Sequence, residues 1–335
     1  MTGLGWGFIG ASIWARERLV PAVQAAEGAD AVGVFSTSAD RGQTFATEGG
    51  LRRAYDSLDA LLTDPDIDIV YISTTNDLHA AQTIAAAAAG KHVLCEKPLA
   101  TTVSEALRMV EACEQAGVVL ATNHHLRGAA TIMKLRALIT EGAVGEVLTA
   151  RIHFCSLLPE AMRTWRLTRP DAGGGVALDL TTHSADTIRF ILDDEIVEVS
   201  AMTSSGGLGQ SAVEDTVVGV MRSATGPLVG FHDSFVTPHA TNGLEIHGTK
   251  ASLFADDVLT AEPVGQLWLR HGSQVTPVTV GRRWPLYDNA VNRFMAAVRG
   301  NGEPLTSGRD GAASLAIALA ALESAREGHP VAPTV

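Results

Sequence analysis

Several features that mark common protein classes are scarce in this sequence or absent from it. The chain has only three cysteines, Cys95, Cys113 and Cys155, which are widely spaced within apolar runs. This spacing predicts buried thiols rather than a disulfide or zinc framework. The alanine-rich stretch QTIAAAAAG is short and interrupted by polar residues, and the first ten residues lack a basic segment. We therefore expect neither a membrane span nor a signal peptide, and the cytoplasm is the expected compartment.

Positive charge is also scarce. The chain has 25 Lys and Arg against 37 Asp and Glu, which gives a formal net charge of -12. Such a surface repels phosphate backbones and anionic lipids, and no block rich in Lys or Arg offsets the repulsion. We therefore expect no nucleic-acid or membrane partner.

The apolar and charged fractions, 46% and 19%, are typical of a compact folded protein, and 335 residues predict two domains. Residues 1–122 alternate short apolar runs with helical segments, which predicts a doubly wound parallel sheet, a Rossmann domain. Residues 123–335 contain helical segments at 133–139, 176–190, 288–298 and 311–327, and alternating runs without intervening helices between 195 and 280. They predict an α+β domain with a large, open, mainly antiparallel sheet. The predicted fold class is therefore α/β, with these two domains.

Individual elements can also be predicted. Residues 243–254 read as one alternating strand region, residues 274–280 as another, and residues 176–190 as a helix. Thr102 and Glu105 predict a capping box at a helix start, and Gly117 predicts the end of that helix.

The segment GWGFIGASIWARE follows the first predicted strand and opens a helix. It matches the dinucleotide-binding pattern G-x-G-x-x-G imperfectly, because Gly10 stands at the tight turn, Ser12 replaces the second glycine and Ala15 the third. Serine still allows the backbone to approach a pyrophosphate and adds a hydroxyl donor. A purely structural turn of small residues is the alternative interpretation.

The second predicted strand ends in VFSTSADRG. An NAD site usually has a carboxylate here, but this chain has Ser36, followed by Thr37, Ser38 and Arg41. Hydroxyl groups and a guanidinium favour a 2′-phosphate, and therefore NADP. The alternative is that Arg41 is a solvated helix residue and Asp40 binds the ribose.

The stretch LCEKPLA ends the fifth predicted strand with two opposite charges and a proline. Lys97 is therefore expected at the carboxyl edge of the sheet, where such folds bind ligands, with Pro98 ending the ladder. A lysine beside a cofactor can donate a proton or polarise a carbonyl, and Glu96 can hold its orientation. The alternative is an exposed ion pair of little energetic consequence.

Asp179 and His183 are four residues apart in the predicted helix of GGGVALDLTTHSADTIRF, so they share one helix face. A carboxylate and an imidazole on an apolar face, together with a lysine, can form a proton-transfer group. A core histidine satisfied by an aspartate is the structural alternative. Only His124 and His125 are candidates to complete a metal site, and we expect no metal.

These segments, together with STTNDLH, TNHHLR, TWRLTRPDAGGG and EIHGTKASL, resemble the glucose-fructose oxidoreductase/inositol dehydrogenase family over nearly the whole chain. The resemblance implies that Lys97 binds and protonates the substrate oxygen, that Asp179 orients the substrate and that His183 is the principal acid or base. It also implies a set of residues that bind the cofactor or line its site: Gly10, Ser12, Ile13, Ala15, Ser36, Thr37, Ser38, Arg41, Thr74, Asn76, His79, Glu96, Lys97, Asn123, Trp165 and Arg166.

The activity implied by the resemblance is the NADPH-dependent reduction of a cyclic keto sugar, with 1,5-anhydro-D-fructose to 1,5-anhydro-D-mannitol as the favoured reaction. A different NAD(P)-dependent sugar or inositol dehydrogenase is the alternative, because pocket loops set specificity on one scaffold. A non-enzymatic NADP-sensing regulator is the more distant alternative. The sequence leaves open whether the protein is a monomer or a homo-oligomer formed through the C-terminal sheet.

Overall fold

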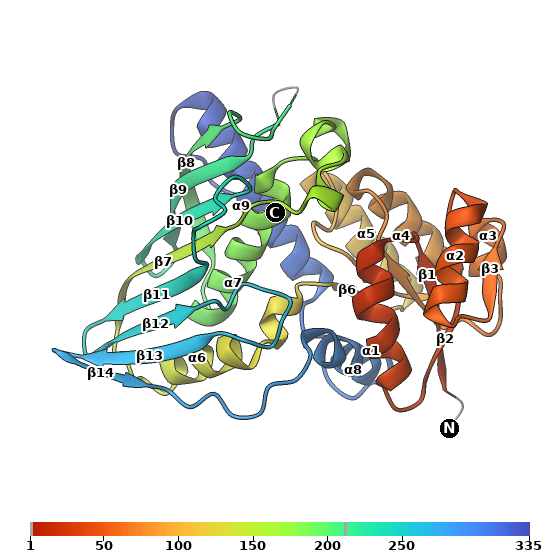
Figure 1. Cartoon of the computed structure of the whole chain (residues 1–335), viewed down its shortest axis with the longest axis horizontal. Helices are drawn as coiled ribbons and strands as arrows, with labels where there is room; N and C mark the ends of the chain where they lie inside the picture. The colour runs from red at the N-terminus through yellow and green to blue at the C-terminus, as the bar shows by residue number, and fades with distance from the viewer. Residues whose placement is uncertain (1–2, 211–212) are drawn as a thin grey trace. The chain divides into compact units, whose positions relative to one another are not determined.

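The computed structural model describes residues 3–210 and 213–335 (Figure 1). The chain divides into two compact units: the first contains the residues up to His125 and Tyr287–Ala312, and the second contains Leu126–Leu286 and Ala313–Val335. Among the described residues, no helix combines the length and the apolar composition needed to cross a membrane.

The first unit is built on a parallel sheet of six strands in the order β3-β2-β1-β4-β5-β6. This order confirms the predicted doubly wound fold, in which the strand order reverses between β1 and β4 and ligands bind beyond the carboxyl ends of the strands. Strands β1 and β4 are almost entirely buried, as expected where helices cover both faces. The strands span Leu4–Ile9 (β1), Ala29–Phe35 (β2), Arg53–Tyr55 (β3), Ile69–Ile72 (β4), His92–Cys95 (β5) and Leu120–Thr122 (β6).

Helices connect these strands, and the predicted signals at the ends of one of them are confirmed. Thr102 caps α5 by accepting a 3.2 Å hydrogen bond from the backbone N–H of Glu105, and Gly117 ends α5 with a φ of 67°. The helical segments are η1 (Ala15–Leu19), α1 (Val20–Ala25), α2 (Ala39–Gly49), α3 (Leu58–Leu62), η2 (Asn76–Leu78), α4 (His79–Ala88), α5 (Val103–Ala116) and α8 (Leu286–Val298). The three cysteines are free and buried, as predicted.

A late segment of the chain returns to the first unit. Phe294 of α8 packs on Trp6 of β1 with ring centroids 5.8 Å apart. The backbone N–H of Thr122 donates to the carbonyl of Thr306 at 3.2 Å, beside an antiparallel bridge between Ala121 and Ser307. The predicted division at 122/123 assigns this segment to the second domain, whereas in the structure it completes the core beside β1 and β6.

The second unit contains a sheet of eight strands in the order β14-β13-β12-β11-β7-β10-β9-β8. All neighbouring pairs are antiparallel except β7 and β10, so the sheet is mainly antiparallel, as predicted. The strands span Val147–Cys155 (β7), Ile196–Ser204 (β8), Thr216–Ser223 (β9), Leu228–Ser234 (β10), Gly243–Gly248 (β11), Ser252–Asp256 (β12), Gln266–His271 (β13) and Gln274–Pro277 (β14).

Three predicted elements differ in detail. Residues 243–254 form two paired strands rather than one, because the chain turns between Gly248 and Ser252. Residues 274–280 are strand only as far as Pro277, after which the N–H of Val278 makes one further bond, of 2.7 Å, to the carbonyl of Leu267. The helix over 176–190 begins as a π-helical turn, η7 (Ala177–Thr181), and continues as α7 (Thr182–Leu192).

The helical segments of the second unit lie on the sheet, with η7 in contact with β9 and β10 and α7 in contact with β7. The remaining ones are η3 (His125–Gly128), which starts at the boundary between the units, α6 (Ala130–Thr140), η4 (Glu160–Met162), η5 (Trp165–Leu167), η6 (Pro170–Ala172) and α9 (Gly308–Glu327), whose first residues belong to the first unit.

Candidate active site

The turn after β1 requires glycine at position 10. Gly10 has a φ of 99°, and a Cβ atom there would lie 3.0 Å from the backbone of Ser73 and from the side chain of Thr74. A larger residue would therefore be both strained and crowded. The backbone at the switch point of the sheet is left bare, as a pyrophosphate at this position requires.

Ser12 stabilises the start of the following helix. Its hydroxyl donates to Ser73 Oγ and accepts from the backbone N–H of Ala15, both at 3.0 Å. Ala15 is fully buried, as the third position of the motif requires for close packing of helix on strand, whereas Ile13 is 57% exposed. Ser12 thus links the turn after β1 to the end of β4.

The residues after β2 form a polar turn. Ser36 Oγ accepts from the backbone N–H of Ser38 at 3.3 Å, and Ser38 Oγ caps α2 by accepting from the N–H of Arg41 at 3.4 Å. The side chains of Thr37 and Arg41 are exposed. An anion beyond β2 would therefore meet hydroxyl groups, a guanidinium and the positive end of a helix dipole.

Buried His79 joins the loop after β4 to the loop after β5. Its Nδ1 lies 3.0 Å from the carbonyl oxygen of Pro98, and its Nε2 lies 3.3 Å from that of Thr74. Burial lowers the pKa of His79, and the hydrogen bonds to the backbone carbonyl groups around the ring oppose this change. Thr74 also donates to Gln82 at 2.7 Å. Neighbouring Asn76 is buried as well. Thr74, Asn76 and His79 therefore lie together beside the carboxyl ends of β4 and β5.

Glu96 lies at the centre of a polar cluster beyond β5. Its Oε1 accepts hydrogen bonds from the hydroxyl of Tyr71 and, at 2.7 Å, from the side-chain amide of Asn123. Its Oε2 accepts from the backbone N–H of Lys97 at 3.3 Å. Burial raises the pKa of Glu96, while the two side-chain donors and the charge of Lys97 oppose the rise. These contacts fix the backbone from which Lys97 extends.

A second cluster in the first unit was not predicted from the sequence. The ring of Tyr287 stacks on His125 with centroids 4.9 Å apart, and its hydroxyl accepts a hydrogen bond from the indole N–H of Trp14. Tyr287 Oη also lies 3.3 Å from His125 Nδ1. Burial, and next the charge of Lys97, lower the pKa of His125 to about 3, so its imidazole is neutral at physiological pH.

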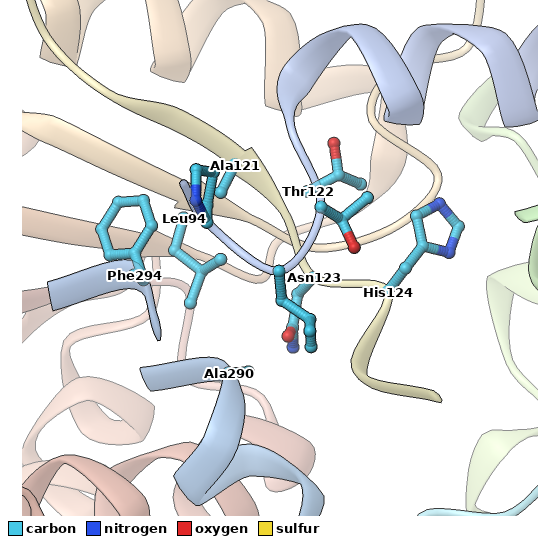
Figure 2. Close-up of a pocket in the computed structure, with 10 residues that line it drawn as sticks. Leu94, Ala121, Thr122, Asn123, His124, Ala290 and Phe294 are labelled. Atoms are coloured by element: carbon cyan, nitrogen blue, oxygen red, sulfur yellow. The ribbon is translucent and has the colours of Figure 1, made fainter. Parts of the chain in front are cut away.

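Asn123 also lines a small cavity, together with Leu94, Ala290 and Phe294 (Figure 2). The cavity encloses about 10 Å³, which is space for roughly one water molecule and far too little for a cofactor or a sugar. Asn123 Oδ1 and Thr306 Oγ1 are buried there, and neither has a hydrogen-bond partner within the described residues. The cavity thus adjoins the Glu96 cluster through Asn123.

In the second unit, Asp179 lies in the π-helical turn and His183 follows in α7. Asp179 Oδ2 lies 3.5 Å from the guanidinium Nε of Arg166, and this guanidinium stacks over the ring of Trp165 at 4.7 Å. His183 is 4% exposed, and its ring is 6.0 Å from that of Phe154. The structure therefore brings Trp165, Arg166 and Asp179 together.

The glycines before the π turn allow this assembly. A Cβ at Gly174 would lie 2.8 Å from the carbonyl oxygens of Trp165 and Arg169, and a Cβ at Gly175 would overlap the carboxyl group of Glu214. Close approach of the backbone at these two positions therefore requires glycine.

Lys97 belongs to the first unit, and Asp179 and His183 belong to the second. Across the described residues, no group of three or more His, Cys, Asp and Glu side chains is arranged to hold a metal ion.

Comparison with known proteins identifies the family. Residues 4–124 match the family model described as an oxidoreductase family with an NAD-binding Rossmann fold, and residues 132–254 match the GFO/IDH/MocA C-terminal domain. The chain belongs to the GFO/IDH/MocA oxidoreductase family. The family assignment agrees with a bare turn after β1 and a dinucleotide-binding sheet.

Two curated members of the GFO/IDH/MocA family illustrate the relationship. The chain is 47% identical to the 1,5-anhydro-D-fructose reductase of Ensifer adhaerens over 97% of both chains. It is 30% identical to the myo-inositol 2-dehydrogenase of Thermotoga maritima over 87% of both chains. Among solved structures, an aldose-aldose oxidoreductase from Caulobacter crescentus complexed with glycerol has a TM-score of 0.91 at 26% identity, covering 98% of this chain and 99% of that chain. The family thus includes oxidoreductases of sugars and of inositols.

Proposed function

We propose that this protein catalyses the NADPH-dependent reduction of a cyclic keto sugar, with 1,5-anhydro-D-fructose as substrate and 1,5-anhydro-D-mannitol as product. The observation that carries the proposal is the 47% identity to the Ensifer adhaerens 1,5-anhydro-D-fructose reductase over 97% of both chains. Lys97, Asp179 and His183 are all present in this chain, which supports a catalytic role over that of a regulator.

The preference for NADP is supported by the polar turn after β2. Ser36 stands where an NAD site usually has a carboxylate, and the exposed Arg41 lies in the first turn of the helix that Ser38 caps. In our proposal, Ser36 and Arg41 bind the 2′-phosphate and the bare turn at Gly10 accepts the pyrophosphate.

In the proposed mechanism, NADPH supplies the hydride for the ketone carbon. The protein residues bind the sugar, orient it and deliver the proton. Lys97 or His183 protonates the oxygen as negative charge develops on it, and Asp179 holds the face of the sugar that carries the hydroxyl groups. The contact between Asp179 and Arg166 restrains that carboxylate at 3.5 Å. Glu96 holds the backbone at Lys97 through a 3.3 Å hydrogen bond.

The test is NADPH oxidation at neutral pH with 1,5-anhydro-D-fructose, an inosose, a 3-keto-glucoside and glucosone, with NADH run in parallel. We expect rapid turnover of 1,5-anhydro-D-fructose with NADPH and little or none with NADH. Turnover of only another compound would assign the protein to a different sugar or inositol dehydrogenase, and turnover with only NADH would overturn the cofactor assignment. Tight NADPH binding without turnover of any carbonyl compound would support a regulator.

We also propose the cytoplasm as the compartment. The three free, buried cysteines support this assignment, because disulfides are rare in reducing compartments.

A further inference from the structure

Glu214 contacts the helix that carries Asp179 and His183, although Glu214 itself lies outside that helix. It lies two residues before β9, and its Oε1 accepts a 2.9 Å hydrogen bond from the backbone N–H of Ala177, the first residue of the π turn. The backbone carbonyl of Glu214 accepts a second bond, of 3.1 Å, from the N–H of Val176. One residue thus satisfies two successive N–H groups at the start of the helix, which otherwise lack intrahelical acceptors.

The position of this carboxylate is energetically unfavourable in isolation. Burial raises the pKa of Glu214, and the hydrogen bond from Ala177 is the largest opposing effect. The absence of a side chain at Gly175 provides the space, because a Cβ there would overlap the carboxyl group. Because a partly desolvated carboxylate is stabilised by a hydrogen bond, the space left at Gly175 lets Glu214 form the bond with Ala177 that offsets this cost.

The loop segment 207–209 is held by the side chain of Asp215 and not by that of Glu214. Asp215 Oδ2 accepts three backbone N–H groups, from Gly207, Leu208 and Gly209, at 2.7 to 3.0 Å. The side chain of Glu214 points instead to the helix. Its contribution is therefore separable from the folding of the loop.

The helix start held by Glu214 is a π turn, with the N–H of Thr182 bonded to the carbonyl of Ala177. The carbonyl of Leu178 accepts instead from the hydroxyl of Thr182 at 2.9 Å. A π turn has more residues per turn than an α-helix, so it changes the direction in which Asp179 points relative to His183. Such turns are rare and are frequently found at functional sites. If the bond at Ala177 is lost, the segment can relax to α-helical geometry and Asp179 rotates away from its position.

We propose that Glu214 is a positioning residue: its carboxylate fixes the first N–H of the π turn and so sets the orientation of Asp179 relative to His183. The inference rests on the proposed function, because it assigns Asp179 and His183 to the reaction.

The test compares two substitutions with opposite properties. Glu214→Gln loses the charge but keeps an oxygen that reaches the N–H of Ala177, whereas Glu214→Asp keeps the charge and is one methylene too short. Glu198→Gln is the control, because Glu198 is a half-exposed glutamate on β8 that pairs with Arg222. Each full-length variant is assayed for kcat, for KM of the sugar and for the dissociation constant of NADPH.

We expect Glu214→Asp to lose about ten- to a hundredfold in kcat/KM for the sugar, the cost typical of a small misplacement of reacting groups. For Glu214→Gln and Glu198→Gln, kcat/KM for the sugar should stay within about threefold of wild type, because neither change moves the reacting groups. NADPH binding should be unchanged in all three variants, because Glu214 and Glu198 are not among the residues proposed to hold the cofactor. Equal losses in the Asp and Gln variants, or no loss in the Asp variant, would overturn the proposal.

Amide hydrogen exchange over residues 175–184 tests the positioning role without an activity assay. Exchange should be faster in Glu214→Asp and close to wild type in Glu214→Gln. Unchanged exchange in the Asp variant would overturn the positioning role. If wild-type protein turns over none of the sugars, the proposed function fails, and the exchange result still decides whether Glu214 holds the π turn.

Discussion

The side-chain amide of Asn123 donates a 2.7 Å hydrogen bond to the carboxylate of Glu96, and the hydroxyl of Tyr71 donates to the same oxygen. The three residues lie at or beside the ends of β4, β5 and β6. The cluster therefore ties together the edge of the sheet from which Lys97 extends.

Removal of one donor from this cluster should destabilise the fold. Asn123→Ala leaves the half-buried Glu96 carboxylate with one donor fewer, which should lower the free energy of unfolding by about 1–3 kcal/mol. Urea denaturation at pH 7 measures the change. Gln115→Ala is the matched control, because Gln115 donates to Glu111 at 3.0 Å on an exposed helix surface, where loss of the bond should cost less than about 0.5 kcal/mol. Equal effects in the two variants would contradict the structural role of the cluster.

Arg41 should discriminate between the two nicotinamide cofactors. Arg41→Ala removes the exposed guanidinium beyond β2 and should weaken NADPH binding by about ten- to a hundredfold, the typical loss of a charge-assisted hydrogen bond. NADH binding should change little. Arg52→Ala, which removes an exposed arginine paired with Asp30 at 2.6 Å, is the control. Fluorescence titration with both cofactors provides the measurement, and an equal loss for NADPH and NADH would assign Arg41 a role unrelated to the 2′-phosphate.

Lys97 and His183 should affect turnover far more than cofactor binding. Lys97→Ala or His183→Ala removes a proton donor and should lower kcat by about 10²–10⁴-fold, the usual contribution of general acid–base catalysis. NADPH binding should remain close to wild type. Steady-state kinetics on the identified sugar, with NADPH titration alongside, provides the measurement. Near-normal turnover in either variant would refute its catalytic assignment.

His125 should make the stability of the protein depend on pH. Its pKa falls from 6.5 to about 3 on folding, mainly through burial, so below pH 6.5 the unfolded chain binds a proton that the folded protein excludes. The stabilisation is full above pH 6.5 and is lost as the pH falls towards 3, at up to about 1.4 kcal/mol per pH unit. Urea denaturation at pH 7 and pH 5 should show that the free energy of unfolding falls less between these two pH values in His125→Gln than in wild type. His271→Gln, at an exposed position, should leave the drop unchanged, and a drop in His125→Gln equal to that of wild type would be the contrary result.

Local patterns in the sequence were sufficient for much of the fold. Alternating apolar runs and helices predicted the parallel sheet, Thr102 and Gly117 predicted the ends of one helix, and the position of Lys97 after a buried strand placed it at the carboxyl edge. These features depend on residues that are close in the sequence, or on the rule that the carboxyl ends of parallel strands lie at one edge of the sheet. They can therefore be read without knowledge of distant contacts.

The missed features depend on segments far apart in the sequence. Tyr287 reaches His125 only because α8 returns to the first unit, and Glu214 reaches Ala177 only because β9 lies beside η7. Neither residue stands in a recognisable motif. The π turn was missed for another reason, since residues that suit an α-helix at 3.6 residues per turn also fit a locally wider turn.

The return of Tyr287–Ala312 to the first unit has a consequence for protein engineering. The chain passes between the two units three times, after His125, after Leu286 and after Ala312. A gene fragment that stops at residue 125 would omit Phe294 and the partner of Ala121, leaving Trp6 and β6 uncovered. Chimaeras that combine the nucleotide-binding part of one family member with the sheet-bearing part of another therefore need three splice points rather than one.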